Sequence, residues 1–369
     1  MHGNGRKETQ IVSLKIDVPH GHDALMEFIL FQDRANAART ARWPANVPLL
    51  LPILSGESPF NIDREFRPLV VREGGEIVAR AMAVLDQRYI RHWKERIGHV
   101  VFFEALPDAR EATALLMEEA CEWLRDKGAE AARTGMGMLD FPYVIDAYEP
   151  LPPSLLRQNP PHYHLLLKHA GFITEKGMVD YKIRVRPELV DRWESALEGA
   201  RRAGYAIVPL RDIPEKQRVS EFTALWNDTF ASHWGFTPFV EEEIALFFAL
   251  LDMVGILDTS VIAYQGEDPV GMLYVSRDIP SLAVLAPGRV LDDSERLNVL
   301  GIGVRGRARG RGVNYAMASH AFLELVKRGH TWLSYTLVLD DNWPSRRTAV
   351  GLGADLCATF VAYRRNFER

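Results

Sequence analysis

The sequence has few cysteines, no surplus of positive charge and no long hydrophobic run. Cys121 and Cys357 are its only cysteines, and they allow neither a metal-binding spacing nor a disulfide framework. The formal net charge is −5, whereas proteins that bind nucleic acid usually carry a basic excess. The most apolar run, 244–257, contains Asp252 and is too short to cross a bilayer. The N-terminus has no apolar signal region. These absences predict a cytoplasmic protein without metal, nucleic-acid partner or integral membrane segment.

Strand-like and helix-like segments follow the same order in both halves of the chain. A hairpin pattern around Gly75 matches one around Gly266, and a helix ending at Gly128 matches one ending at Gly329. A third matching pair of segments lies near the end of each half. Matches in the same order at nearly constant offset predict one fold used twice. The alternative is a chance likeness between strand–helix–strand units.

The predicted fold class is α/β, or α+β, with two similar domains. Each domain is expected to hold a mixed, mostly antiparallel twisted sheet flanked by helices. The charged stretch 181–201 contains the seam, which divides the chain into 1–186 and 187–369.

The segment "VRGRARGRG", residues 304–312, is either an arginine–glycine tail for nucleic acid or a loop for phosphate. A buried-strand pattern, "LNVLGIGV", precedes it and an amphipathic helix pattern follows it, whereas a tail should have low-complexity flanks. A strand, a glycine loop and a helix start direct backbone N–H groups and the helix dipole toward one place. The flanks therefore predict a phosphate loop.

The spacing Arg307-x-x-Gly310-x-Gly312 resembles the pyrophosphate-binding signature of the GNAT superfamily of acyl-CoA-dependent N-acyltransferases. Downstream, the segment from Asn342 to Gly353 resembles the final helix of that superfamily. Most of residues 60–369 also resemble a bacterial group of tandem GNAT-like proteins.

The resemblance implies acetyl-CoA or a longer acyl-CoA as co-substrate, a small-molecule amine as acceptor and no metal. It places the pyrophosphate on residues 305–312 and the pantetheine near Gly303, Val304 and Asn342. The predicted cofactor-binding residues are Gly303, Val304, Arg305, Arg307, Arg309, Gly310, Arg311, Gly312 and Asn342. A homodimer is left open.

The first half departs from this pattern, because only Pro107 and a helix cap separate its strand "VVFFEAL" from the next helix. Without a glycine loop it cannot build the same anion site. It is expected to be a degenerate copy that supplies either one wall of the acceptor pocket or scaffolding alone.

Acyl transfer to an amine needs a proton acceptor for the amine and a proton donor for the thiolate. The strand 297–304 has no ionisable group, so the candidate bases lie elsewhere: His233, Glu295 and the carboxylates Glu241, Glu242 and Glu243. Ala349 occupies the position where relatives often carry a tyrosine acid, and Tyr363 or Tyr335 could replace it. His233, Glu241 and Tyr363 are the predicted catalytic residues, although each of these groups could instead be structural.

The helix pattern from Glu243 to Gly255 is apolar nearly all round. It predicts either burial between the two halves or a border to a hydrophobic, long-chain acceptor. The sequence thus favours an N-acyltransferase, most simply an N-acetyltransferase. A non-catalytic acyl-CoA-binding or sensing protein and a Fem-like aminoacyl transferase are the alternatives.

Overall fold

The structure is a computed structural model and describes residues 13–368. Its first half contains the following elements: β1 (Leu14–Asp17), α1 (Gly21–Ala35), β2 (Ala41–Arg42), α2 (Val47–Ser55), β3 (Arg64–Glu73), β4 (Glu76–Asp86), α3 (Gln87–Trp93), β5 (Ile97–Ala105), α4 (Arg110–Asp126), β6 (Ala131–Thr134), β7 (Tyr143–Val144), α5 (His162–His169) and β8 (Ile173–Arg184).

The second half continues with these elements: α6 (Pro187–Arg202), β9 (Tyr205–Pro209), α7 (Glu215–Thr229), α8 (Glu241–Leu251), α9 (Ile256–Thr259), β10 (Val261–Gln265), β11 (Asp268–Arg277), β12 (Val284–Leu285), β13 (Asn298–Val304), α10 (Val313–Lys327), β14 (Trp332–Leu339), α11 (Trp343–Gly351) and β15 (Asp355–Asn366).

Apart from short extra elements, both halves have the same order. One strand and two helices precede a group of strands, and a helix, a strand, a helix and a final strand follow. The β3–β4 hairpin and α4 of the first half thus correspond to the β10–β11 hairpin and α10 of the second. The expected repeat of matching elements is present along the chain.

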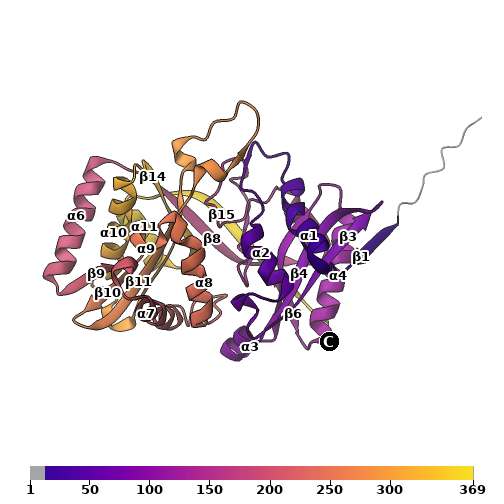
Figure 1. The fold of residues 1–369 in the computed structure, drawn as a ribbon, viewed down its shortest axis with the longest axis horizontal. Coiled ribbons are helices and arrows are strands. Elements are labelled where there is room, and N and C mark those ends of the chain that lie inside the picture. Colours follow the sequence, from indigo (N-terminus) through magenta and orange to yellow (C-terminus); the bar gives the residue numbers. More distant parts are fainter. Residues whose placement is uncertain (1–12, 369) are drawn as a thin grey trace, which may run out of the picture.

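The final strand of each half pairs with the other half. Among the described residues, the larger sheet has the order β1-β3-β4-β5-β6-β15-β8-β14, and a second sheet has the order β13-β11-β10-β9. Strand β15 lies between β6 and β8, and β8 pairs antiparallel with β14. Figure 1 shows β8 and β15 running between the two halves. The halves are therefore joined through a shared sheet and not through a linker alone.

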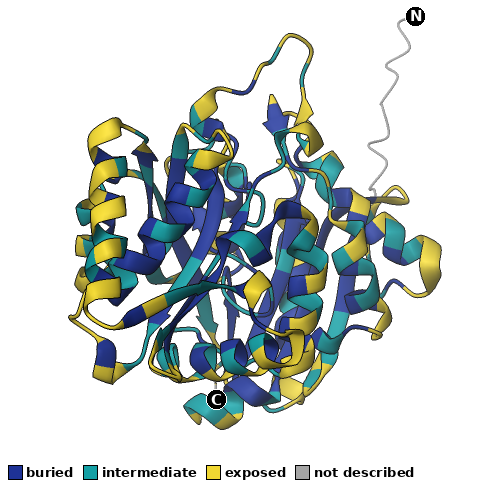
Figure 2. Ribbon diagram, turned by 60° about the vertical axis from the view of Figure 1, so that its left-hand side comes forward, coloured by how far each residue is buried: buried dark blue, intermediate teal, exposed yellow. Residues whose placement is uncertain are grey.

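Helices cover both halves around buried strands, as the colouring in Figure 2 shows. In the first half, α4 and α5 bury one hydrophobic cluster, and α1 and α2 bury another on the opposite face. In the second half, α6 and α10 pack on one side of the sheet and α7, α8 and α9 on the other. Most ladders are antiparallel, and β5–β6 is parallel. This arrangement confirms the predicted fold class.

The boundary at residues 186 and 187 falls just where α6 begins at Pro187. It separates the two repeats along the sequence, but β8 and β15 each pair with a strand from the other side of this boundary. It stays a prediction that the two ranges are domains. Within the described range, no helix is long and apolar enough to cross a membrane.

Candidate functional site: a cavity between the two halves

Two parallel strands of the second half, β13 and β14, belong to different sheets and diverge toward their carboxyl ends. Near their starts, Asn298 and Ser334 exchange two hydrogen bonds of 2.8 and 3.0 Å. One step further, the Thr336 hydroxyl accepts from the Leu300 amide at 3.2 Å. Beyond this point the structure records no hydrogen bond between the two strands in the described residues. The divergence leaves a groove whose walls are backbone.

Backbone alternation decides which groups of β13 face this groove. The Leu300 amide points to β14, whereas the Arg305 amide donates to Val270 on β11 at 2.8 Å. Amides of even-numbered residues, including Val304, therefore lie on the open edge. Gly303 serves another purpose, because a Cβ there would lie 2.1 Å from the Thr229 hydroxyl of α7. Of the two predicted pantetheine contacts on β13, Val304 is the one whose amide faces the groove.

The loop from Arg305 to Gly312 follows β13 and ends at the N-terminus of α10. Gly310 and Gly312 have φ values of 75° and 80°, which favour glycine. A Cβ at either glycine would meet nothing within 4 Å, so the backbone is open to a ligand. Within the described residues, the amides of 310–312 donate to no backbone carbonyl. Free amides at a helix N-terminus form an anion site, and this backbone fits a pyrophosphate.

The four arginines of this loop have different surroundings. Arg305 donates to Asp228 at 2.8 Å, and Arg307 is bonded to Asp268. Arg309 is exposed and donates its Nε to the Val304 carbonyl at 3.0 Å. Arg311 is also exposed. Arg307 is exposed too but is held by Asp268, so Arg309 and Arg311, which form no ion pair in the described residues, are the ones most readily turned to a phosphate.

A cavity of about 780 Å³ lies between the two halves. The groove contributes residues 300–302 of β13 and 335–338 of β14, and Asn342 at the start of α11 also lines the cavity. Most of the remaining wall is aromatic or aliphatic. The exposed residues of its lining mark where it opens, and they are Pro44, Asn46, Pro48, Met253 and Leu282. The opening is therefore mostly apolar and is built from both halves.

Helix α8 forms part of the cavity wall and also packs between the halves. Ile244, Phe247 and Leu250 line the cavity, and Leu246 packs against the hydrophobic cluster beneath α1 and α2. The sequence predicted either burial between the halves or a border to the acceptor. The helix does pack between the halves, and its border to an acceptor stays a prediction. The helix ends at Leu251, well before Gly255.

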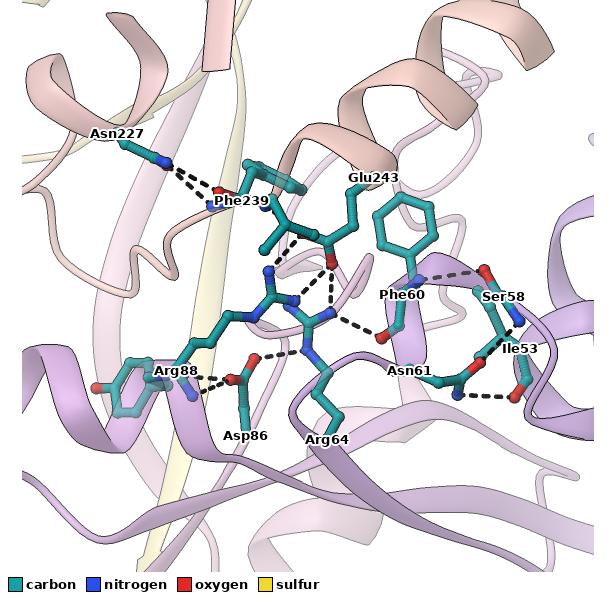
Figure 3. A network of polar contacts seen from close by, with 12 residues as sticks. Ile53, Ser58, Phe60, Asn61, Arg64, Asp86, Arg88, Asn227, Phe239 and Glu243 are labelled. Carbon is teal, nitrogen blue, oxygen red and sulfur yellow. Dashed lines mark hydrogen bonds and ion pairs between the residues drawn. The ribbon is translucent and has the colours of Figure 1, made fainter. Parts of the chain in front are cut away.

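Glu243 of α8 is fully buried in a network with arginines of the first half (Figure 3). Arg88 donates to its two oxygens at 2.6 and 2.7 Å, and Arg64 donates at 2.5 Å. Arg64 also pairs with Asp86 at 2.6 Å. Both oxygens of Glu243 are thus occupied, and this residue fixes α8 to the first half.

The other carboxylates suggested by the sequence do not reach the cavity. Glu241 and Glu242 are exposed in the first turn of α8 and do not line it. Glu295 is buried and accepts from Arg289, from the Leu151 amide and from the Asp292 amide. Neither the predicted base Glu241 nor Glu295 is brought to the groove.

His233 does line the cavity, and burial lowers the pKa of its imidazole below the usual 6.5. Asp341 and Lys176 lie near enough to influence this pKa, which places His233 close to the start of α11. Asn342 caps that helix by accepting from the Ser345 amide at 3.2 Å. The structure therefore brings His233 and Asn342 to the same region of the cavity.

The two candidate tyrosines lie in different places. Tyr335 lines the cavity from β14, its hydroxyl is 3.0 Å from the Ser345 hydroxyl, and burial raises its pKa to about 12. Tyr363 is buried on β15, and its hydroxyl lies 2.7 Å from Nδ1 of His164 in the first half. Tyr363 does not line the cavity, so Tyr335 is the tyrosine at the groove.

Arg80 and Glu104 also line the cavity, from β4 and β5 of the first half. The sequence analysis assigned them no role. Each is a single charge inside an otherwise apolar strand, in "IVARAMAV" and "VVFFEAL". That pattern is a usable signal, because charged side chains are rarely buried without a partner. Across the described residues, no group of three or more His, Cys, Asp or Glu side chains could hold a metal.

Comparison of the sequence with known proteins gives two distant relatives, and no family model matches. The chain is 23% identical over 199 residues to Protein YghO of Escherichia coli (strain K12), covering 52% of this chain and 50% of that protein. It is 21% identical over 189 residues to Bacterial ceramide synthase of Caulobacter vibrioides (strain NA1000 / CB15N), covering 50% and 49%. The chain thus matches about half the length of these curated relatives.

Solved structures resemble almost the whole chain. A GCN5-related glucosamine N-acetyltransferase region of a fungal multi-domain GH3 beta-N-acetylglucosaminidase gives a TM-score of 0.60 at 15% identity, covering 98% of this chain and 39% of that one. A tandem GNAT protein from the clavulanic acid biosynthesis pathway gives 0.55 at 14%, covering 96% and 98%. The chain therefore has the tandem GNAT-like fold that its sequence motifs predicted.

Proposed function

We propose that this chain is an acyl-CoA-dependent N-acyltransferase whose acceptor is a hydrophobic, long-chain amine. The single observation that carries the proposal is the continuity of the β13–β14 groove with a large apolar cavity. The groove leads to an anion-binding loop at one end and to the cavity at the other. A polar nucleotide and an apolar acceptor could thus approach the same point from opposite sides.

The loop provides for acyl-CoA through the free amides of 310–312 and the exposed Arg309 and Arg311. Acyl-CoA would supply the acyl group as a thioester. The Val304 amide on the open edge of β13 and Asn342 at the start of α11 would contact the pantetheine. The Val304 amide also lies where it could donate to an oxyanion.

His233 is the proposed proton acceptor, since its lowered pKa keeps the imidazole neutral at pH 7. The amine nitrogen forms a C–N bond with the thioester carbonyl carbon as the C–S bond breaks, and its proton passes to His233. Tyr335 is the proposed donor to the departing thiolate, because a pKa of about 12 keeps its hydroxyl protonated.

The acceptor class is proposed from the walls of the cavity and supported by one relative. The apolar opening and the aromatic side chains of α7 and α8 favour a long hydrocarbon chain over a polar peptide or sugar. One relative bears the name Bacterial ceramide synthase, and a ceramide is an N-acylated long-chain amine. An integral membrane segment is not needed for such an acceptor to enter the cavity.

The test is release of free thiol from acetyl-CoA and palmitoyl-CoA with butylamine, dodecylamine and a lysine peptide as acceptors. We expect turnover with dodecylamine at a kcat/KM at least tenfold above that with butylamine, since each buried methylene contributes about 0.8 kcal/mol. Binding of acyl-CoA without thiol release would instead support a sensor. Equal rates with all amines would contradict the proposed acceptor.

A further inference from the structure

Arg80 and Glu104 stand side by side on the wall that the first half contributes to the cavity. They are directly paired residues of the antiparallel strands β4 and β5. Paired residues project from the same face of a sheet with their Cβ atoms about 5 Å apart. Both line the cavity, and they are only 1% and 8% exposed. A positive and a negative side chain are thus adjacent in a mostly apolar chamber.

These two side chains do not neutralise each other through a direct ion pair. Arg80 donates from Nη1 to the Phe28 carbonyl, and its Nε has no partner. Glu104 accepts at Oε2 from the Tyr163 hydroxyl at 2.6 Å and from the Asn36 amide nitrogen at 3.1 Å. Among the described residues, Oε1 of Glu104 and Nη2 of Arg80 have no hydrogen-bond partner. Each residue is held in place, and within the described range Glu104 keeps one unpartnered oxygen while Arg80 keeps two unpartnered nitrogens, of which Nε is buried.

The second carboxylate of the cavity lining, Asp140, differs from Glu104 in this respect. Its Oδ1 accepts from the Phe102 amide at 3.2 Å and from Arg157, and its Oδ2 accepts from the Gly135 amide at 2.9 Å. Both of its oxygens are therefore occupied. Glu104 is the lining carboxylate with an oxygen left for a ligand.

The charges of the pair select the kind of group that fits between them. Burial lowers the pKa of Arg80 to about 10, so its guanidinium stays charged at neutral pH. Burial, the largest influence, raises the pKa of Glu104 above its usual value, although Arg80 and Arg157 act to lower it. An isolated ammonium would be repelled by Arg80, and a carboxylate by Glu104. A neutral hydroxyl can donate to one and accept from the other.

We propose that Arg80 and Glu104 form a subsite for a hydroxyl group of the acceptor. The hydroxyl donates to Oε1 of Glu104 and accepts from Nη2 of Arg80. The acceptor is accordingly a long-chain amine that also carries a hydroxyl, and the pair determines this specificity. The identity of the ligand as the acceptor rests on the proposed N-acyltransferase function. The first half thereby has a role in recognition.

The test is calorimetric binding of two probes, dodecan-2-amine and 2-aminododecan-1-ol, to the full chain without acyl-CoA. The probes differ by one hydroxyl. We expect the wild type to bind the amino alcohol about tenfold more tightly, because a hydrogen bond to a charged group adds about that much to the affinity. Glu104→Ala should bind both probes with similar affinity. The ratio of the two dissociation constants is taken within one variant, so a general loss of affinity for both probes cancels.

Two further variants make the result decisive. Glu65→Gln removes an exposed carboxylate from β3 and should keep the tenfold preference. Glu104→Gln keeps the side-chain volume if the alanine variant does not fold, and it should lower the preference. A wild type without preference, without binding of either probe, or a Glu104→Ala variant that keeps the preference would overturn the subsite.

The calorimetry and the thiol-release assay, run with the same two probes, separate this subsite from the proposed function. If the wild type prefers the amino alcohol but releases no thiol from any acyl-CoA, the N-acyltransferase proposal fails and the subsite stands. If turnover occurs with equal KM for both probes, the function stands and the subsite fails.

Discussion

The two halves of this chain share one order of elements and differ in the gap between their central strands. In the second half, β13 and β14 separate after Leu300, and the gap opens into a cavity. In the first half, β5 and β6 separate after His99, but an ion pair fills the gap. Asp140 accepts from the Phe102 amide of β5, and Arg157 donates to the Phe103 carbonyl at 2.9 Å.

The difference continues beyond the strands. Eight residues, 305–312, separate β13 from α10 and form the glycine loop, whereas β5 is followed by α4 after residues 106–109 alone. As far as the structure describes the first half, it has neither the loop nor the open groove. It contributes instead a wall of the shared cavity and most strands of the shared sheet, to which the second half adds β14 and β15. The second half nevertheless depends on the structure of the first, because β8 pairs with β14.

The largest expected effect comes from separating the halves at residues 186 and 187. Fragment 1–186 would lack β15, which lies between β6 and β8, and fragment 187–369 would leave β14 without β8. Unpaired strands with hydrophobic faces aggregate or stay unfolded. We expect neither fragment to show a cooperative thermal transition by circular dichroism. A sharp transition in either one would show that the halves fold independently.

A second prediction concerns His233, which lines the cavity. His233→Gln should lower kcat by about 10²–10⁴-fold, because a general base contributes that much. Only the neutral imidazole accepts a proton, so wild-type kcat/KM should fall as the pH drops through a pKa below 6.5. The variant should lose this acidic limb.

The matched control for His233 is Glu241→Gln, which changes an exposed carboxylate outside the cavity. It should leave kcat within about twofold of wild type, as for most surface changes. A larger loss with Glu241→Gln than with His233→Gln would reverse the assignment of the base.

A smaller effect is expected from the ion pair that fills the gap of the first half. Arg157→Leu leaves Asp140 buried without its counter-charge, which typically costs about 3–5 kcal/mol of unfolding free energy. Adding Asp140→Asn should recover part of this loss. Urea unfolding measures both changes.

The surface pair of Arg91 and Asp63, with side chains 59% and 45% exposed, provides the comparison. Arg91→Leu should cost less than about 1 kcal/mol. If Arg157→Leu lowers the free energy of unfolding by no more than Arg91→Leu does, the pair of Arg157 and Asp140 does not stabilise the first half.

Local patterns in the sequence were enough to predict the repeated fold and the glycine loop. The hairpins at Gly75 and Gly266 and the motif of 304–312 depend on neighbouring residues alone. The exchange of β8 and β15 could not be predicted, because the local pattern shows which segments are strands but not which half supplies the neighbour of each final strand. Pairing of that kind is decided by packing across the whole molecule.

The candidate site was predictable only in part for the same reason. His233 was proposed as one of several candidate bases because the strand 297–304 has no ionisable group, and it lines the cavity. Glu243 looked like Glu241 and Glu242 in sequence, but arginines about 150 to 180 residues earlier bury it. Tyr363 follows β15 into the first half, away from the groove. Arg80 and Glu104 carried a signal, but only the pairing of β4 with β5 shows that they are adjacent.

The most direct test of the difference between the halves is calorimetric titration of acetyl-CoA and palmitoyl-CoA into wild type and two glycine variants. Gly310→Trp and Gly266→Trp both place a side chain at positive φ, 75° and 63°, with open space around the Cβ. The account predicts one site per chain, lost in Gly310→Trp and kept in Gly266→Trp. Two sites per chain, or wild-type affinity in Gly310→Trp, would contradict it.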